Sequence, residues 1–243
     1  MKEHGRGFRT ITALIAASVL AMTMLLCGCV GGTNNGEEVR SKDGVEITDC
    51  GYSIETGDLW AVVHNGTEDT FKSVGVDYLV TDAEGNQIGD SISAIEMPYL
   101  EPGETRYVAD TLHAYDSEND EFIKDFDATD KVRIELYTSV VMSKDALKDI
   151  KPATQIVGKN IQVDYQEGSE IGFYFDMEND TDYDYKGYHA YYLYKDEDGN
   201  YCGGYCEDLD GLKAHESRNV YGYTENFHGT DVEVYLRPFT DEE

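Results

Sequence analysis

Basic residues are scarce in this sequence, which has 19 lysine and arginine residues against 49 aspartate and glutamate residues. The formal net charge is −30 at pH 7. Binding to nucleic acid, or flat binding to anionic lipid, requires basic patches. We therefore expect no nucleic-acid partner. The composition suits a well-hydrated exterior domain or one that binds cations.

Signatures of catalytic sites are also lacking. No serine lies in a Gly-x-Ser-x-Gly motif, and the histidines do not have the His-x-x-x-His or His-Glu-x-x-His spacing of metal sites. Carboxylates are so numerous that choosing two of them as a catalytic pair would have no basis. We predict that the protein is not an enzyme.

The longest apolar run is at the N-terminus, where residues 11–26 follow a basic leader. This length suits a secretion signal and is short for a membrane span. The run ends in Leu26-Cys27-Gly28-Cys29, which resembles the lipobox of bacterial lipoprotein signals. The resemblance implies cleavage after residue 28, lipid on the sulfur of Cys29, and attachment to the extracytoplasmic face of the cell membrane. The alternative is an ordinary signal peptide or an uncleaved anchor.

Cleavage would remove three basic residues and one acidic residue, which changes the formal charge to −32. Residues 29–44 are rich in glycine, asparagine and charge, and they show no periodicity. We expect them to form a flexible tether.

The rest of the chain contains an internal repeat, since the segment from His64 matches the segment from Glu178. The residues that recur 114 positions later are Asn65, Thr67, Lys72, Tyr78, Leu79, Asp82, Gly85, Asn86 and Gly89, matching Asn179, Thr181, Lys186, Tyr192, Leu193, Asp196, Gly199, Asn200 and Gly203. Further on, Leu100, Glu104 and Arg106 recur as Leu212, Glu216 and Arg218. Identities in the same order across separate blocks indicate two copies of one module.

Each copy consists of short runs of Val, Ile, Tyr, Leu and Thr, separated by clusters of Gly, Asn and Asp. Such runs predict strands, and such clusters predict tight turns. The sequence has no long amphipathic helix; the best helix candidate is Ser143 to Ile150, which Ser143 could cap and Pro152 would end. We predict an all-β protein with sandwich modules at 45–142 and 155–243, joined by a linker at 143–154.

This arrangement resembles the FxLYD-type immunoglobulin-like modules of bacterial lipoproteins. The matching motifs are the Asn-x-Thr turns at Asn65 and Asn179, the strands that end in YLVTDAEGN and YLYKDEDGN, and the Leu-x-Pro-Gly-Glu turn at Leu100. The second copy has Ala214-His215 in place of Pro-Gly. The resemblance covers most of residues 45–243. It implies two tandem antiparallel immunoglobulin-like β-sandwiches that act as an extracytoplasmic interaction module without catalytic residues.

One acidic segment is a candidate for Ca²⁺; no other cofactor is expected. Positions 1, 3, 5 and 12 of a calcium-binding loop would be Asp196, Asp198, Asn200 and Glu207. Position 6 is Tyr201, where the loop needs glycine, so a hairpin turn with solvated carboxylates is the simpler interpretation. The acidic insertion at residues 116–130 is a weaker cation candidate.

The second copy is rich in tyrosine. Strand alternation places Tyr188, Tyr192 and Tyr194 on one face, where exposed rings could bind a sugar or a peptide. The alternative is that they pack inside the sheet as cross-strand pairs. Cys202 and Cys206 could form a disulfide if Gly203 and Gly204 bend the chain; otherwise they are buried thiols.

Together these observations predict a lipid-anchored extracytoplasmic protein with a non-catalytic binding or spacer role in the bacterial cell envelope. Its partner would be an envelope protein or a glycan. The alternative is a ligand-binding lipoprotein whose tyrosine-rich, acidic second module recognises carbohydrate or a divalent cation. Exposure of the tyrosine rings would favour that alternative, and burial would favour a spacer.

Overall fold

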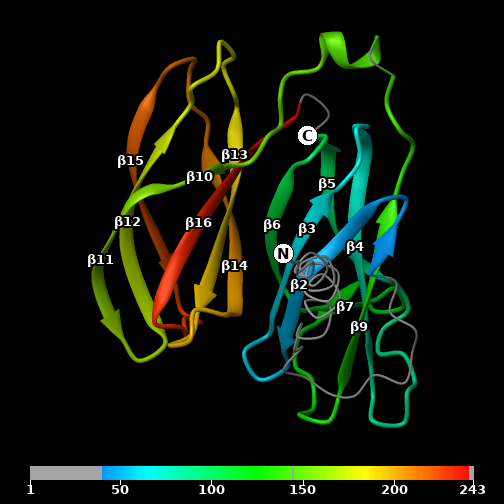
Figure 1. Ribbon diagram of the computed structural model, residues 1–243. Helices are drawn as coiled ribbons and strands as arrows, with labels where there is room; N and C mark the ends of the chain where they lie inside the picture. The colour runs from blue at the N-terminus through cyan, green and yellow to red at the C-terminus, as the bar shows by residue number, and fades with distance from the viewer. Residues whose placement is uncertain (1–39, 144, 241–243) are drawn as a thin grey trace, which may run out of the picture.

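The computed structural model describes residues 40–143 and 145–240 (Figure 1). Within this range the regular structure consists of antiparallel strands and one short 3₁₀ helix, η1 (Ala146–Asp149), which confirms the predicted all-β class. No helix among the described residues is long and apolar enough to span a membrane. The predicted signal peptide, Cys29 and most of the tether lie outside the described residues.

The first half of the chain, residues 41–142, forms two sheets that enclose one core. The first sheet has the order β1 (Ser41–Lys42), β2 (Val45–Ser53), β3 (Asp58–Asn65) and β6 (Thr105–Thr111). The second has the order β5 (Ser93–Leu100), β4 (Phe71–Thr81) and β9 (Lys131–Thr138). At the start of the acidic insertion, β7 (Ala114–Asp116) pairs with β8 (Glu121–Ile123).

The second half, residues 156–240, repeats this arrangement. One sheet has the order β10 (Ile156–Val157), β16 (Asp231–Pro238), β13 (Gly187–Lys195) and β14 (Tyr201–Asp210). The other has the order β11 (Lys159–Glu167), β12 (Glu170–Glu178) and β15 (Ser217–Thr224). Strands β11, β12 and β15 are therefore the equivalents of β2, β3 and β6. That each half folds alone remains a prediction.

The recurring residues make the same contacts in both halves. The Nδ2 atom of Asn65 donates to the carbonyl oxygens of Asp69 and Glu101, and that of Asn179 donates to the corresponding oxygens four and 34 residues ahead. The hydroxyls of Thr67 and Thr181 donate to these asparagines, each at 2.7 Å. The repeated sequence thus encodes one turn that ties the end of a strand to a neighbouring loop.

Two boundaries differ from the sequence prediction. Ser41 to Gly44, assigned to the tether, form β1 and a two-residue turn in which Asp43 and Gly44 both have positive φ, as a type I′ hairpin requires. The segment expected to be helical forms only η1, although the backbone N–H of Ala146 does donate to Ser143 Oγ at 3.2 Å. The chain becomes extended at Ile150.

The two halves pack through sheets. Gly204 on β14 lies against Ala109 on β6, and the Tyr235 ring on β16 stacks on the Tyr107 ring on β6 with centroids 4.0 Å apart. Tyr191 and Leu193 of β13 belong to the same buried cluster as the core of the first half. The four sheets are therefore layered, and the sheet of β11, β12 and β15 is the layer farthest from the first half (Figure 1).

Candidate functional site

One sheet face is used differently in the two halves. In the first half, the outer face of β2, β3 and β6 contacts the second half; we call it the covered face, formed by Asp58, Trp60, Val62, Tyr107 and Ala109. In the second half, we call the outer face of β11, β12 and β15 the open face. Its residues are Asn160, Tyr165, Glu170, Gly172, Tyr174, Asp176, Asn219, Tyr221 and Tyr223.

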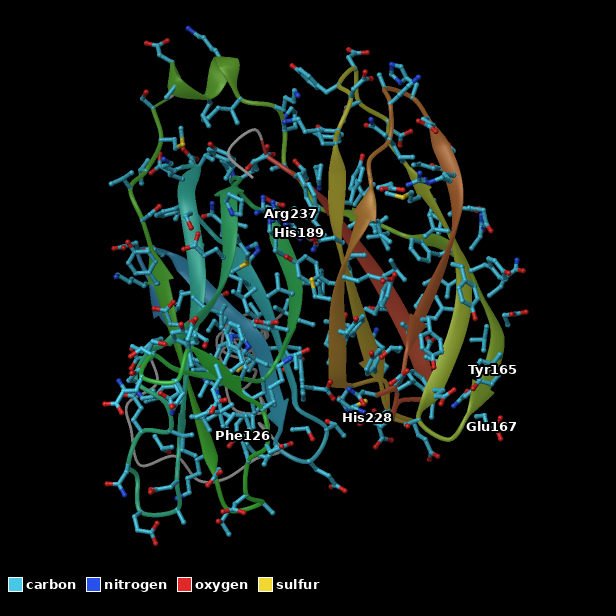
Figure 2. All side chains as sticks on the ribbon, turned by 180° about the vertical axis from the view of Figure 1, so that it is seen from behind. Phe126, Tyr165, Glu167, His189, His228 and Arg237 are labelled. Atoms are coloured by element: carbon cyan, nitrogen blue, oxygen red, sulfur yellow. The ribbon has the colours of Figure 1, made fainter. Side chains whose placement is uncertain are left out.

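The open face lies away from the first half. Figure 2 shows Tyr165 and Glu167 on this outer side, while His228 and Arg237 lie on the side that faces the first half. No described element covers it, since 42 % of Tyr174 and 44 % of Tyr221 are exposed. Exposed aromatic rings on a sheet face are a common feature of binding surfaces.

Strand alternation and a glycine build this face. In β12, the residues Ile171, Phe173 and Phe175 point into the core, so Gly172, Tyr174 and Asp176 point outward. Tyr221 is directly opposite Tyr174, with ring centroids 5.0 Å apart and planes inclined by 59°. The end of the Tyr221 ring occupies the space that a side chain at position 172 would fill.

Carboxylates lie at both ends of the tyrosine pair. The Asp176 carboxylate accepts hydrogen bonds from Asn160 Nδ2 at 2.8 Å and from Asn219 Nδ2 at 2.7 Å. These bonds lower the pKa of Asp176, so it is ionised at neutral pH. At the other end, the Tyr165 hydroxyl donates to Glu170, which raises the pKa of Tyr165 to about 12. The face therefore combines apolar rings, phenol donors and negative charge.

The tyrosines proposed from sequence as ligand-binding residues are not on this face. Tyr188, Tyr192 and Tyr194 are fully buried in the core of the second half. The Tyr192 hydroxyl donates to Glu207, and that of Tyr194 donates to Thr224 Oγ1 at 3.1 Å. They cannot contact a ligand in this structure, and the cross-strand packing alternative holds for these rings.

The proposed calcium ligands are not brought together. Asp196 caps the β13–β14 turn, where its Oδ1 accepts from the backbone N–H groups of Asp198 and Asn200, each at 2.9 Å. Glu207 lies several residues along β14, about 20 Å away at the rise of a strand, and accepts from Tyr192. No group of three or more metal-ligating side chains is found among the described residues, the acidic insertion included.

The proposed disulfide is absent, because Cys202 and Cys206 are both free thiols. The register of β13 and β14 shifts between Tyr194 and Lys195, which places a bulge at Cys202 in β14. Cys202 consequently packs against the core of the second half, whereas Cys206 packs against the cluster shared with the first half. Burial raises the pKa of Cys202 to about 11 and that of Cys206 to about 12, so both thiols are protonated at neutral pH.

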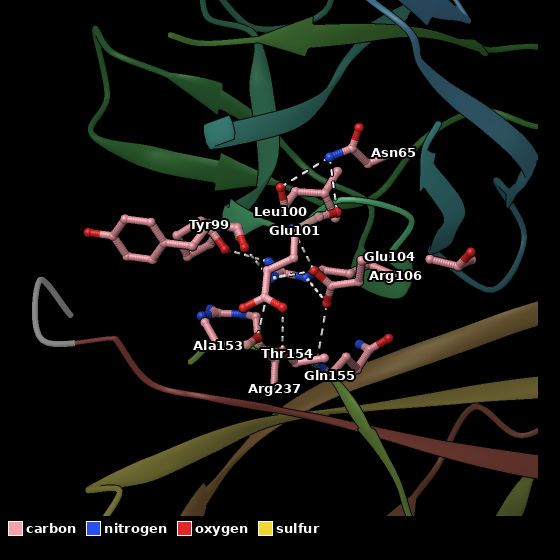
Figure 3. A network of polar contacts seen from close by, with 12 residues as sticks. Asn65, Tyr99, Leu100, Glu101, Glu104, Arg106, Ala153, Thr154, Gln155 and Arg237 are labelled. Carbon is pink, nitrogen blue, oxygen red and sulfur yellow. Dashed lines mark hydrogen bonds and ion pairs between the residues drawn. The ribbon is translucent and has the colours of Figure 1, made fainter. Parts of the chain in front are cut away.

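The linker holds the halves together through a polar network (Figure 3). The Gln155 side chain pairs with the backbone of Tyr107, accepting at 2.8 Å and donating at 2.7 Å. Arg106 is fully buried; its Nε donates to Glu104 at 2.8 Å, and one of its NH groups donates to the carbonyl oxygen of Ala153 at 3.2 Å. These contacts fix the second half against β6, and so they leave the open face on the outside.

A second contact between the halves joins a buried acid to a histidine. Asp58 Oδ2 accepts from Thr56 Oγ1 at 2.6 Å and lies 3.3 Å from His228 Nε2. Burial raises the pKa of Asp58 to about 6, although the threonine hydroxyl and His228 act in the opposite direction.

Comparison with known proteins identifies no family. No family model matches the chain, and no curated protein matches it. Among solved structures, red sea bream transglutaminase is similar at 9 % identity and a TM-score of 0.23, over 86 % of this chain and 28 % of that one. A 7S globulin of Momordica charantia is similar at 8 % identity and a TM-score of 0.19, over 84 % of this chain and 81 % of that one. The chain spans less than a third of the transglutaminase, and likenesses at these TM-scores carry no functional inference.

Proposed function

We propose that the protein is a lipid-anchored, extracytoplasmic binding protein of the bacterial cell envelope, which holds a partner on the open face without catalysis. The observation that carries this proposal is the exposed pair Tyr174 and Tyr221 on the face whose equivalent in the first half is a packing surface. The lipobox at residues 26–29 supports the envelope location.

A spacer role is the second candidate. Burial of Tyr188, Tyr192 and Tyr194 removes the face that the sequence offered for ligands, and the network around Arg106 would make the two halves a stiff unit. A spacer role does not explain the exposed aromatic rings of the open face, however, and so we place it second to binding.

Binding can be tested by capture from detergent-solubilised envelope with the lipid-bearing chain, carrying a C-terminal tag. The variant Tyr174→Ser/Tyr221→Ser removes both rings, and Tyr137→Ser/Val140→Ser is the matched control, since it removes exposed apolar side chains from the first half. We expect one envelope component to be retained by the wild type and the control and reduced about tenfold or more by the open-face variant. Equal retention by all three, or retention by none, would leave the spacer role.

Anchoring needs a separate test, because binding does not depend on it. Replacing Cys29 with serine removes the sulfur that would carry lipid. We expect radiolabelled palmitate to be incorporated into the wild type and not into Cys29→Ser, which should leave the membrane fraction. Cys27→Ser is the control and should behave as wild type; equal labelling of the two variants would contradict the proposal.

A further inference from the structure

We propose that the partner of the open face is a protein surface that presents lysine or arginine side chains. This inference rests on the proposed binding function and goes beyond it by naming the chemistry of the partner.

The geometry points to a flat protein surface, because the first half already holds one on the equivalent face. Trp60 corresponds to Tyr174, and Ala109 corresponds to Tyr221, by the shared register of the strands. In the first half these positions lie beneath β13 and β14 of the second half. The open face offers the same three strands at the same outer positions.

The charge of the face selects a basic partner. Asp176 and Glu170 lie at opposite ends of the tyrosine pair, and Glu167 lies beside them on the same outer side of the molecule. Among the described residues, two basic side chains belong to β11, β12 and β15. Lys159 is paired with Glu178, and Arg218, opposite Met177, donates to the Asp210 carbonyl oxygen. Neither side chain is paired with Asp176, Glu170 or Glu167, so an approaching cation would gain attraction.

The chain itself contains the arrangement that we expect across this interface. The ammonium group of Lys195 lies 5.0 Å from the centroid of the Tyr201 ring and 2.6 Å from Glu233 Oε1. The Tyr201 hydroxyl donates to the same carboxylate at 2.7 Å. A lysine of the partner would find a ring and a carboxylate in the same combination at Tyr165 and Glu170.

A second copy of the chain offers a weaker charge match. By repeat equivalence it would present the outer face of β4, β5 and β9, which carries Asp77, Glu96 and Glu135. The same face also carries Lys131 and Arg133, and Arg133 is paired with Glu135. Burial and the charge of Glu96 raise the pKa of Asp77, whereas Lys42 acts in the opposite direction, so that face has a mixed charge. Against Asp176 and Glu170 this mixed face would bring like charges together as well as opposite ones, so it matches the open face less well than a uniformly basic surface does.

Two other modes of binding also fit the open face less well: addition of a partner strand to the sheet edge, and stacking of a sugar chain on the tyrosine rings. The free edge of β11 is interrupted by two register shifts, which obstruct pairing with another strand. The Tyr174 and Tyr221 rings are inclined by 59°, so they do not form one plane for a glycan chain.

The test measures binding of a fluorescent octalysine peptide to the full chain in detergent, with octaglutamate and a chito-oligosaccharide as comparison probes. Glu170→Gln/Asp176→Asn removes two charges from the open face. Glu96→Gln/Glu135→Gln removes two charges from the outer face of β4, β5 and β9 and is the matched control. We expect about a fivefold or greater loss of octalysine affinity in the first variant and less than about twofold in the second.

The variant Tyr174→Ser/Tyr221→Ser keeps the net charge and separates a specific site from general attraction to an acidic protein. We expect it to weaken octalysine binding about threefold or more. Equal losses in the two charge variants, with no loss in the tyrosine variant, would overturn the proposal. Tyrosine-dependent binding of the chito-oligosaccharide, or tyrosine-dependent dimerisation, would replace the basic partner with a glycan or a second copy. Tyrosine-dependent envelope capture without octalysine binding would retain the proposed function and reject this partner class.

Discussion

In the first half, the outer face of β2, β3 and β6 is buried against the second half, whereas the equivalent face of β11, β12 and β15 is exposed. The Asn-x-Thr turns of the two halves are the same down to individual hydrogen bonds, as the Asn65 and Asn179 contacts show. The outer positions differ, with Ala109 in one half and Tyr221 in the other. Positions that make the fold have therefore been kept, and positions that meet a neighbour have diverged.

The same Glu-x-Arg motif occurs in both halves but in different surroundings. Arg106 is covered by the linker and is fully buried, and the side chain of its partner Glu104 is 7 % exposed. Arg218 is half-buried and donates to the Asp210 carbonyl oxygen at 2.6 Å. Removing one member of a buried ion pair leaves the other charge unpaired, whereas an exposed pair contributes little.

The largest expected effect is therefore on Arg106. We expect Arg106→Met to lower the free energy of unfolding by about 3–5 kcal/mol, because Glu104 would remain buried and unpaired. Arg218→Met should cost about 1 kcal/mol or less. Urea unfolding monitored by circular dichroism measures both changes, and equal costs would show that the linker does not isolate Arg106 from water.

The second prediction concerns the acid at the covered face. Asp58 has a raised pKa of about 6 in the folded protein, against about 3.9 in an unfolded chain. The folded state therefore binds a proton more readily between about pH 4 and pH 6, and stability falls as the pH rises through this window. Above pH 6 the ionised carboxylate costs up to about 3 kcal/mol.

Asp58→Asn removes this titration and keeps the size of the side chain. We expect the stability of the variant relative to wild type to rise by up to about 3 kcal/mol between pH 4 and pH 7. The corresponding position on the open face is Gly172, which has no titratable group. Asp176 on that face has a lowered pKa, so the stability of Asp176→Asn relative to wild type should fall as the pH rises, and this change should occur below about pH 4. Parallel pH profiles for wild type and Asp58→Asn would contradict the assignment.

The sequence was sufficient to predict the sheets, the turns and the repeat, because alternation and turn residues are local signals. It also held a signal for the open face: in β12 the apolar residues Phe173 and Phe175 alternate with Tyr174 and Asp176, which marks the second pair as outward. The prediction instead selected β13, where both faces are aromatic.

Alternation could not have decided between the faces of β13. It separates Tyr192 from Tyr191 but does not say what covers either residue. Tyr192 lies in the core of the second half, and Tyr191 is buried against the first half, a contact between segments distant in the chain. Likewise, the pairing of Gln155 with the Tyr107 backbone depends on how the linker crosses β6, which no local pattern encodes.

The smallest predicted effect tests a turn at which the repeats differ. Gly103 has φ +70° in the first half, and His215 has φ 59° at the equivalent position in the second. A left-handed backbone costs a residue with a side chain roughly 1 kcal/mol, and glycine avoids that cost. The contact of His215 Nε2 with Asp182, 2.9 Å long and exposed, offsets little of it.

We therefore expect His215→Gly to raise the free energy of unfolding by about 1 kcal/mol and Gly103→His to lower it by a similar amount. Thermal unfolding measures both variants, with Gly85→Ala as a control at another left-handed glycine, which should also destabilise. If His215→Gly lowers stability, the contact with Asp182 outweighs the backbone cost, and this turn has acquired a role in the second half that its equivalent lacks.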